Sequence, residues 1–147
     1  LTPKLATLAA ELMIETLPHI LAGGIVPRPQ DHARATMFKQ IKKEEGLIDW
    51  TRSAIEIARR VRAFNPWPSA FTFWNGAQLK ILRAEVSRGK ANPEPGQVIQ
   101  VGKEIAVACG DGALILCEIQ LAGKRAMTIE EFVRGQREFI GSVLKNA

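Results

Sequence analysis

Short strands separated by tight turns fill the second half of this 147-residue sequence, and they restrict it to a small antiparallel β domain. From Ala70 onward, strand-forming residues recur at a period of two, which a helix cannot accommodate. Asn75-Gly76 lies between two such segments and favours a two-residue hairpin turn, because both residues tolerate positive φ. We predict five strands, over residues 70–74, 79–86, 97–101, 104–109 and 113–120.

A second tight turn is predicted at Asp111-Gly112, between the last two strands. In that register Cys109 faces Leu114 and Cys117 faces Ala106, so the two sulfur atoms lie on opposite sides of the sheet. Because these are the 2 cysteines of the sequence, no disulfide is expected. This cysteine usage is typical of a reducing compartment and predicts a cytoplasmic protein.

The first 24 residues predict a helix with more apolar surface than a terminal helix usually needs. Thr2 is its candidate N-cap, Pro3 fits the first helical position, and Pro18 is expected to kink the last turn. The polar side chains occupy an arc of only about 80°. The remaining circumference is apolar, with residues at helical spacing at Leu5, Leu8, Leu12, Met13, Leu17, Ile20 and Leu21.

Two capping boxes predict further helices. Ser53-Ala54-Ile55-Glu56 begins one, and Asn65-Pro66-Trp67-Pro68 ends it because each proline disfavours the helical conformation of its predecessor. The two prolines are expected to fix the chain direction between helix and sheet, whereas an alternative role for Trp67 is to stack on a nucleobase. Thr128-Ile129-Glu130-Glu131 begins a closing helix predicted to continue through Phe139.

Together these elements predict an α+β fold: a small antiparallel Greek-key β-barrel of the oligonucleotide-binding kind with flanking helices. The predicted organisation is a helical segment over 1–30, a basic linker over 31–50 and the barrel domain over 51–147. The apolar fraction of 46% and charged fraction of 24% are those of an ordinary folded domain. Since no stretch approaches the roughly 18 apolar residues of a membrane span, no membrane partner is expected.

The net charge of +5 is concentrated in one part of the chain. Residues 31–62 hold eight Lys and Arg against five Asp and Glu, which accounts for three of the five excess charges. Such a cluster can neutralise phosphates and give salt-dependent, sequence-independent affinity. The alternative is a solvated face whose cations pair with Glu44, Glu45 and Glu56.

No spacing in the sequence is typical of an active site. The 2 histidines, His19 and His32, have no cysteine or carboxylate at metal-ligand spacing and are expected to be ordinary surface residues. Gly110-Asp111-Gly112 lacks the strand-loop-helix setting and the Lys-Ser/Thr ending of a phosphate-binding loop. By spacing alone, the sequence offers no catalytic, cofactor-binding or metal-ligating set.

Four separated motifs occur in order along the chain: Lys39–Trp50, Arg62–Pro68, Cys109–Gly112, and the group Gln120, Gly123, Lys124 and Met127. In this order they resemble the carboxy-terminal part of the methionyl-tRNA formyltransferase family. The resemblance covers essentially the whole chain and is specific, because four motifs at matching spacing carry more information than one short pattern.

The resemblance implies a longer parent enzyme. In that family an amino-terminal Rossmann-like domain binds 10-formyltetrahydrofolate, carries an Asn, His and Asp trio, and transfers the formyl group to the amino group of initiator methionyl-tRNA. Leu1–Gly24 resembles the last helix of that catalytic domain, beyond the trio, so no catalytic residue is expected in this chain and the fragment alone is expected to be inactive. Without its partner domain, this helix is expected to be loosely anchored, to fold back on the barrel or to pair with a second copy.

The resemblance also implies where initiator methionyl-tRNA is held. The family's basic linker motif maps onto Lys39–Glu45, although Gln40 stands where lysine is common. No cofactor is expected on the fragment itself. Alternative readings are the related domain of a sugar-nucleotide formyltransferase or of 10-formyltetrahydrofolate dehydrogenase, or a free-standing nucleic-acid-binding module. The candidate tRNA-binding residues are Lys39, Lys42 and Lys43, with Arg59, Arg60 and Arg62 as secondary candidates on charge alone.

Overall fold

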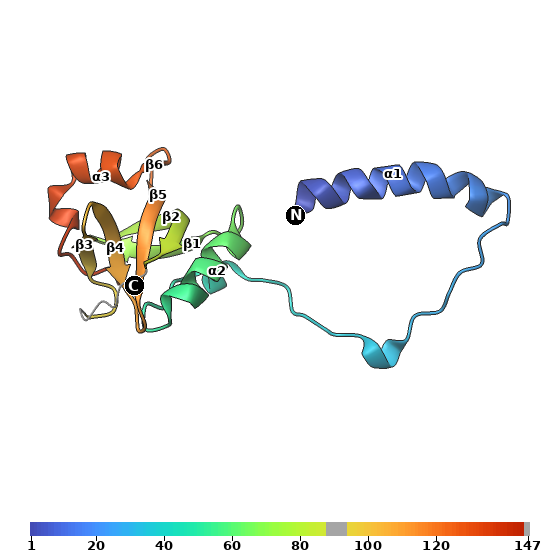
Figure 1. The fold of residues 1–147 in the computed structure, drawn as a ribbon, viewed down its shortest axis with the longest axis horizontal. Helices are drawn as coiled ribbons and strands as arrows, with labels where there is room; N and C mark the ends of the chain where they lie inside the picture. Colours follow the sequence, from blue (N-terminus) through green and yellow to red (C-terminus); the bar gives the residue numbers. More distant parts are fainter. Residues whose placement is uncertain (88–93, 146–147) are drawn as a thin grey trace. The chain divides into compact units, whose positions relative to one another are not determined.

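The computed structural model describes residues 1–87 and 94–145 and divides the chain into two units, Leu1–Lys39 and Gln40–Ala147 (Figure 1). The first unit holds one long helix followed by a segment with little regular structure. The second holds the whole β-sheet and the remaining helices.

Helix α1 spans Thr2–Leu21, as the apolar periodicity predicted. Its N-cap is Leu1 rather than Thr2, because the Leu1 carbonyl already accepts the Leu5 N–H at 3.0 Å. The helix continues through Pro18, whose carbonyl accepts the N–H of Ala22 at 3.0 Å. A short 3-10 turn, η1, follows at His32–Arg34 within an otherwise extended segment.

No residue of α1 is buried. Its large apolar side chains are all exposed, and those of Ile14 and Leu21 are 76% and 80% exposed. A helix with an apolar surface of this width is ordinarily covered by other protein. That it is covered by a partner domain or by a second copy stays a prediction.

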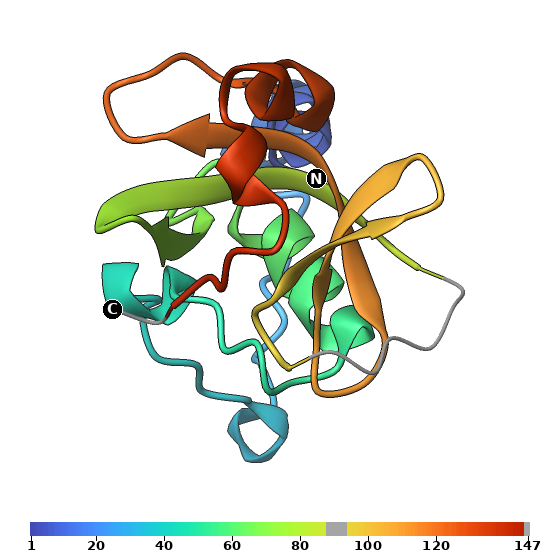
Figure 2. The same ribbon diagram turned by 90° about the vertical axis from the view of Figure 1, so that its left-hand side faces the viewer.

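The second unit is built on a six-stranded antiparallel sheet, and the predicted α+β fold is confirmed (Figures 1 and 2). The strand order is β1-β2-β5-β4-β3, with β6 paired to β5. The sixth strand was missed because two residues are too few to show a period. The strands are β1 (Ala70–Trp74), β2 (Ala77–Val86), β3 (Val98–Val101), β4 (Glu104–Ala108), β5 (Ala113–Leu121) and β6 (Met127–Thr128).

The hairpin between β1 and β2 has the turn that its sequence predicted. Trp74 pairs with Ala77, and the two residues between them, Asn75 and Gly76, have φ of 48° and 75°. Positive φ at both central positions is the signature of a type I′ turn, whose twist matches that of the flanking strands. The two-residue turn therefore sets the register in which β1 and β2 pair.

The turn between β4 and β5 is longer than predicted, because residues 109–112, and not Asp111-Gly112 alone, connect Ala108 to its partner Ala113. Ala106 pairs with Ile115, and the Cys109 N–H donates to the Gly112 carbonyl at 3.0 Å, so Cys109 does not face Leu114 and Cys117 does not face Ala106. Within this turn Asp111 forms a bridge with Ser53, in the earlier segment that enters the helix at 54–64, and this tertiary contact accompanies the changed register. A shift of two residues preserves which face each side chain occupies, and both cysteines are free.

The described strands do not close into a barrel by pairing with one another, because β1 and β3 remain as the two edges. The C-terminal segment 141–145 lies between these edges. Lys145 exchanges two backbone hydrogen bonds with Phe73 of β1, both at 3.1 Å. On its other side, Gly141 donates to Val98 of β3 at 2.9 Å and Leu144 donates to Gly96 at 2.8 Å. The segment therefore hydrogen-bonds to both edge strands, but the sheet itself is not closed, unlike the barrel that the sequence predicted.

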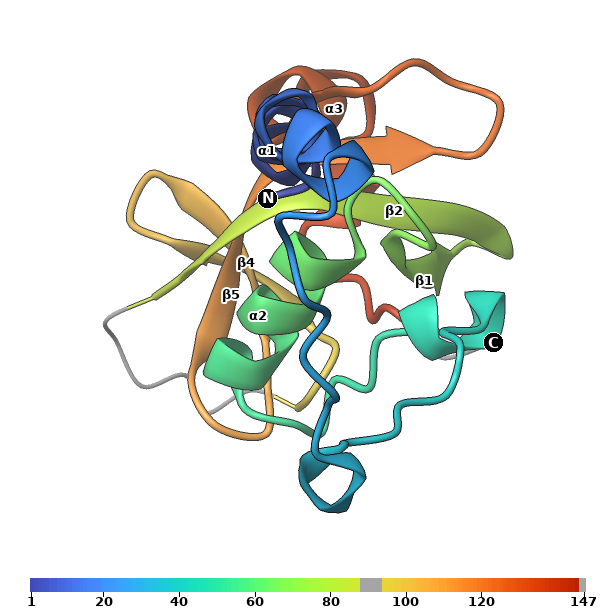
Figure 3. The ribbon, with the colours of Figure 1, turned by 90° about the vertical axis from the view of Figure 1, so that its right-hand side faces the viewer.

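Helix α2 (Ala54–Phe64) begins at the predicted capping box and packs against β2 and β5 (Figure 3). Helix α3 (Ile129–Gly135) begins at Thr128, whose hydroxyl accepts the Glu131 N–H, but it ends at Gly135 instead of continuing through Phe139. Gly135 is a poor helix former, and a 3-10 turn, η3 (Arg137–Phe139), follows it. This turn places the Phe139 ring in the core at 0% exposure.

An aromatic cluster lies at the centre of that core. The rings of Trp74, Phe132 and Phe139 pack edge to face in three pairs, with centroids 5.5, 5.4 and 5.1 Å apart. This geometry places the positive ring edge against a negative ring face. The cluster joins β1 to α3 and η3, so the two ends of the domain are held by the same three side chains.

Candidate nucleic-acid interface

The exposed face of α2 carries the arginines predicted from charge. Ala54, Ile57, Ala58 and Val61 are buried against the sheet, so Arg59 and Arg62 project to the opposite side and are exposed. In the part of the chain that the structure describes, neither arginine has an ion-pair partner. Their charges are therefore available to a polyanion.

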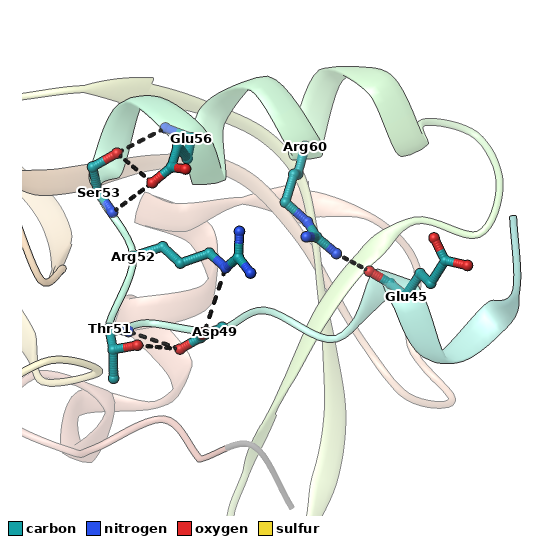
Figure 4. A network of polar contacts seen from close by, with 7 residues as sticks. All are labelled: Glu45, Asp49, Thr51, Arg52, Ser53, Glu56 and Arg60. Atoms are coloured by element: carbon teal, nitrogen blue, oxygen red, sulfur yellow. Dashed lines mark hydrogen bonds and ion pairs between the residues drawn. The ribbon is translucent and has the colours of Figure 1, made fainter. Parts of the chain in front are cut away.

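Arg60 has a different environment from its two neighbours. Its guanidinium donates to the backbone carbonyl of Glu45 (Figure 4). The same guanidinium lies over the Phe64 ring, 5.2 Å from the centroid. The side chain is half-buried. Arg60 thus connects α2 to the turn that precedes it, and its donors are already partly engaged inside the protein.

That turn, η2 (Lys43–Gly46), carries two of the predicted lysines. Lys42 and Lys43 are exposed, and the backbone N–H of Lys42 donates to the Glu45 carboxylate at 3.1 Å. Behind them Gly46 is buried beneath the Ser69 carbonyl, where a Cβ atom would overlap that oxygen. The turn is therefore fixed against the sheet. Lys39, also exposed, is the last residue of the first unit.

Polar contacts at the start of α2 neutralise some of the local charge (Figure 4). The Asp49 carboxylate accepts hydrogen bonds from the Thr51 hydroxyl at 2.6 Å and its N–H at 3.1 Å, which lowers the pKa of Asp49. Arg52 lies 3.4 Å from the same carboxylate. Hydrogen bonds from Ser53 likewise lower the pKa of Glu56. Arg52 is thus partly compensated, which leaves the excess charge on the lysines, Arg59 and Arg62.

The Cys109–Gly112 motif supports this entry segment and is not a phosphate cradle. The Gly110 N–H donates to the carbonyls of Trp50 and Arg52, at 2.9 and 3.0 Å, and the Asp111 carbonyl accepts the Ala54 N–H at 2.9 Å. A Cβ atom on Gly110 would overlap the Thr51 carbonyl oxygen. The hairpin turn therefore holds the segment that leads into α2, through tertiary contacts that the local sequence does not reveal.

Gly110→Ala is expected to lower the free energy of unfolding by about 1–3 kcal/mol, because the strand turn and the 50–54 segment must separate to admit the methyl group. Urea denaturation followed by far-UV circular dichroism measures the loss. Gly135→Ala is the matched control: a Cβ there meets nothing within 4 Å, so stability should stay within about 1 kcal/mol of the parent. Equal midpoints for the two variants would contradict the role assigned to Gly110.

A second basic cluster was not singled out from the sequence. Lys103, Arg134 and Arg137 line a hollow of about 390 Å³ between the β3–β4 hairpin and the α3–η3 segment, together with Glu130. Lys103 is more than thirty residues from the two arginines in the sequence, so only the fold brings it beside them. The helical spacing of Arg134 and Arg137 is the one local signal in the sequence that could have indicated this basic cluster.

The remaining candidate chemical groups do not form an active centre in the described residues. His19 and His32 are exposed, and within 1–87 and 94–145 no group of three or more His, Cys, Asp or Glu is placed to hold a metal ion. Burial raises the pKa of the Cys109 thiol to about 12 and also raises that of Cys117. Both thiols therefore remain protonated at neutral pH and are poor nucleophiles. No helix in those residues has the length and apolarity to cross a bilayer.

The fold and the basic face together define a small antiparallel sheet domain preceded by a cationic entry segment. Residues 40–137 match the family described as formyl transferase, C-terminal domain, and the chain belongs to that family.

Relatives named methionyl-tRNA formyltransferase confirm the resemblance drawn from the motifs. The chain is 44% identical over 138 residues to that of Roseiflexus castenholzii, covering 93% of this chain and 44% of the relative. It is 44% identical over 143 residues to that of Bacillus subtilis, covering 96% of this chain and 45% of the relative. The chain thus spans a little under half the length of these relatives, which by name are transferases.

Solved structures share the fold at low identity. HypX from Aquifex aeolicus matches in a multiple-substitution variant with a TM-score of 0.67 and 17% identity, over 91% of this chain and 24% of that one. The same protein in complex with tetrahydrofolic acid matches with a TM-score of 0.64 and 19% identity, over 92% and 24% of the two chains. Identity at this level supports the fold alone.

Proposed function

We propose that this chain is the tRNA-holding, C-terminal part of a methionyl-tRNA formyltransferase, whose whole length transfers a formyl group from 10-formyltetrahydrofolate to the amino group of initiator methionyl-tRNA. The observation that carries the proposal is the match of residues 40–137 to the formyl transferase C-terminal domain, with relatives that bear this enzyme's name along the chain. In this proposal the protein acts in the cytoplasm, where translation is initiated.

The basic face supports the assignment of a polyanionic partner. Lys42 and Lys43 project from a turn that Arg60 connects to α2, and Arg59 and Arg62 are exposed on that same helix. Because the turn and the helix already have a fixed backbone, binding phosphates there orders side chains but no further backbone. We infer that Lys39, Lys42, Lys43, Arg59 and Arg62 contact the tRNA backbone, and that Arg60 mainly holds the turn in place.

The chemical step is proposed to take place outside this chain. The catalytic trio and the formyl donor of the family belong to its amino-terminal domain, and no residue here inherits those roles. The 147-residue chain should therefore show no formyl transfer when supplied with 10-formyltetrahydrofolate and methionyl-tRNA. Turnover by this chain alone would overturn that part of the proposal.

A salt titration of tRNA binding tests the partner. With five phosphate contacts, the slope of log Kobs against log salt is expected near −4, at about 0.7–0.9 per contact, with Kd of about 10⁻⁶–10⁻⁴ M at physiological salt. Fluorescence anisotropy of end-labelled tRNA at several salt concentrations measures both values. A slope close to zero, or no binding at low salt, would reject a phosphate-contacting function.

A further inference from the structure

The turn that follows α2 has a fixed backbone. The Ser69 N–H donates to the Phe64 carbonyl at 2.9 Å, and the Ser69 hydroxyl donates to the Pro66 carbonyl at 2.8 Å. The Asn65 side-chain amide donates to the Leu82 carbonyl of β2 at 3.3 Å. Since Pro68 is also buried, the turn is anchored at both ends.

Trp67 lies at the middle of this anchored turn, and its side chain is not used to hold it. The residue is 59% exposed, whereas Trp50 and Trp74 are only 3% and 5% exposed. The predicted structural role of the motif is met by Asn65, Pro68 and Ser69, which make the contacts. The structure thus presents a large, rigid, aromatic face to its surroundings, a feature enriched at binding sites.

The surroundings of this turn are polar and carry charges of both signs. A hollow of about 840 Å³ beside it is lined by Arg62, Asn65 and Arg83, together with Glu85 and Glu118. Arg83 pairs with Glu85 at 4.0 Å, while Arg62 has no ion-pair partner among the described residues. An unpaired guanidinium three residues before the turn is complementary to a phosphate, and an exposed indole is complementary to a base.

We propose that Trp67 is a stacking site for one unpaired nucleobase of RNA, with Arg62 contacting a phosphate next to that base. This inference rests on the proposed function and deepens it, because phosphate contacts alone do not distinguish single-stranded from paired RNA. Every base has a π face, so the site is expected to accept any unpaired nucleotide and to read no sequence.

Tryptophan fluorescence reports on the site directly, because the other two tryptophans are buried. Titrating the full chain with a 12-residue oligouridine should quench the emission, whereas inorganic polyphosphate of similar charge should bind without quenching. In Trp67→Phe the quenching should disappear while anisotropy still shows binding. Binding of oligouridine to the parent chain without quenching would overturn the stacking site and leave the phosphate-contacting function intact.

Trp67→Ala is expected to weaken oligouridine binding about tenfold or more, and Trp67→Phe only about twofold, since a phenyl ring still offers a stacking face. The salt slope should be unchanged in both, because no phosphate contact is removed. Ile55→Ala is the matched control. It trims a half-exposed apolar side chain on α2, and we expect it to bind oligouridine as the parent chain does. Near-UV circular dichroism of the two buried tryptophans checks that Trp67→Ala is folded.

Two results would reject the inference. If Trp67→Ala binds oligouridine as tightly as Ile55→Ala, the indole has another partner, such as protein. If the parent chain binds neither oligouridine nor tRNA at low salt, both the stacking site and the proposed function are rejected.

Discussion

Replacing Lys39, Lys42 and Lys43 together by glutamine is expected to weaken tRNA binding about a hundredfold at 0.15 M salt, because each lost phosphate contact costs roughly fivefold through counterion release. The salt slope should become shallower by about two to three units in the same variant. All three lysines are exposed, and glutamine places an uncharged polar side chain at each position, so folding should be unaffected. Anisotropy titrations at several salt concentrations give both quantities.

A second triple variant separates position from net charge. Three other lysines lie outside η2 and α2: Lys80 on β2, Lys124 between β5 and β6, and Lys145 in the C-terminal segment. Changing these three to glutamine removes the same total charge, and we expect it to leave the slope nearly as steep as in the parent chain. If the two triple variants lose affinity equally, binding depends on overall charge and the assigned face is wrong.

Phe139→Ala is expected to lower the free energy of unfolding by about 3–5 kcal/mol, the usual cost of removing a fully buried aromatic ring. The ring is 0% exposed and pairs edge to face with Trp74 and Phe132, so two aromatic contacts are lost along with the buried area. The Ser142 hydroxyl also donates to the Phe139 carbonyl at 2.6 Å, at the start of the segment between the sheet edges. Urea denaturation gives the change in stability.

Hydrogen exchange locates the damage within the fold. The amides of Phe73 and Val98 donate to carbonyls of the C-terminal segment, at 3.1 and 2.8 Å, so they should lose protection first in Phe139→Ala. Phe38→Ala is the matched control, since that ring is 89% exposed and its loss should cost less than about 0.5 kcal/mol. Similar unfolding midpoints for the two phenylalanine variants would show that Phe139 is not a core residue.

Features that depend on neighbouring residues were predictable from the sequence. The turn at Asn75-Gly76 and the cap at Ser53 are specified by residues within a few positions of each other, and both were confirmed. The length of the β4–β5 turn was not predicted, and within that turn Asp111 forms a bridge with Ser53, fifty-eight positions earlier in the chain. The predicted and the observed registers place each side chain on the same face of the sheet, so only the pairing of residues across the two strands was wrong.

In the candidate interface, too, some features were predictable from the sequence and others depend on the fold. Charge counting located the lysines and arginines, which is a property of composition. It could not distinguish Arg60 from Arg59 and Arg62, because the distinction lies in a hydrogen bond to the Glu45 carbonyl fifteen residues away. Nor could it group Lys103 with Arg134 and Arg137, which meet only when the β3–β4 hairpin lies beside η3.

The C-terminal segment that hydrogen-bonds to both β1 and β3 bears on how this domain behaves in concentrated solution. A bare sheet edge is a template on which another chain can add a strand, and such pairing is a common start of aggregation. Here residues 141–145 occupy the outer edges of both strands, and Ile48 donates to the Phe71 carbonyl at 2.8 Å on β1. A chain shortened before residue 141 would expose the edge of β3 and the part of β1 at Phe73, and we expect it to polymerise edge to edge rather than simply unfold.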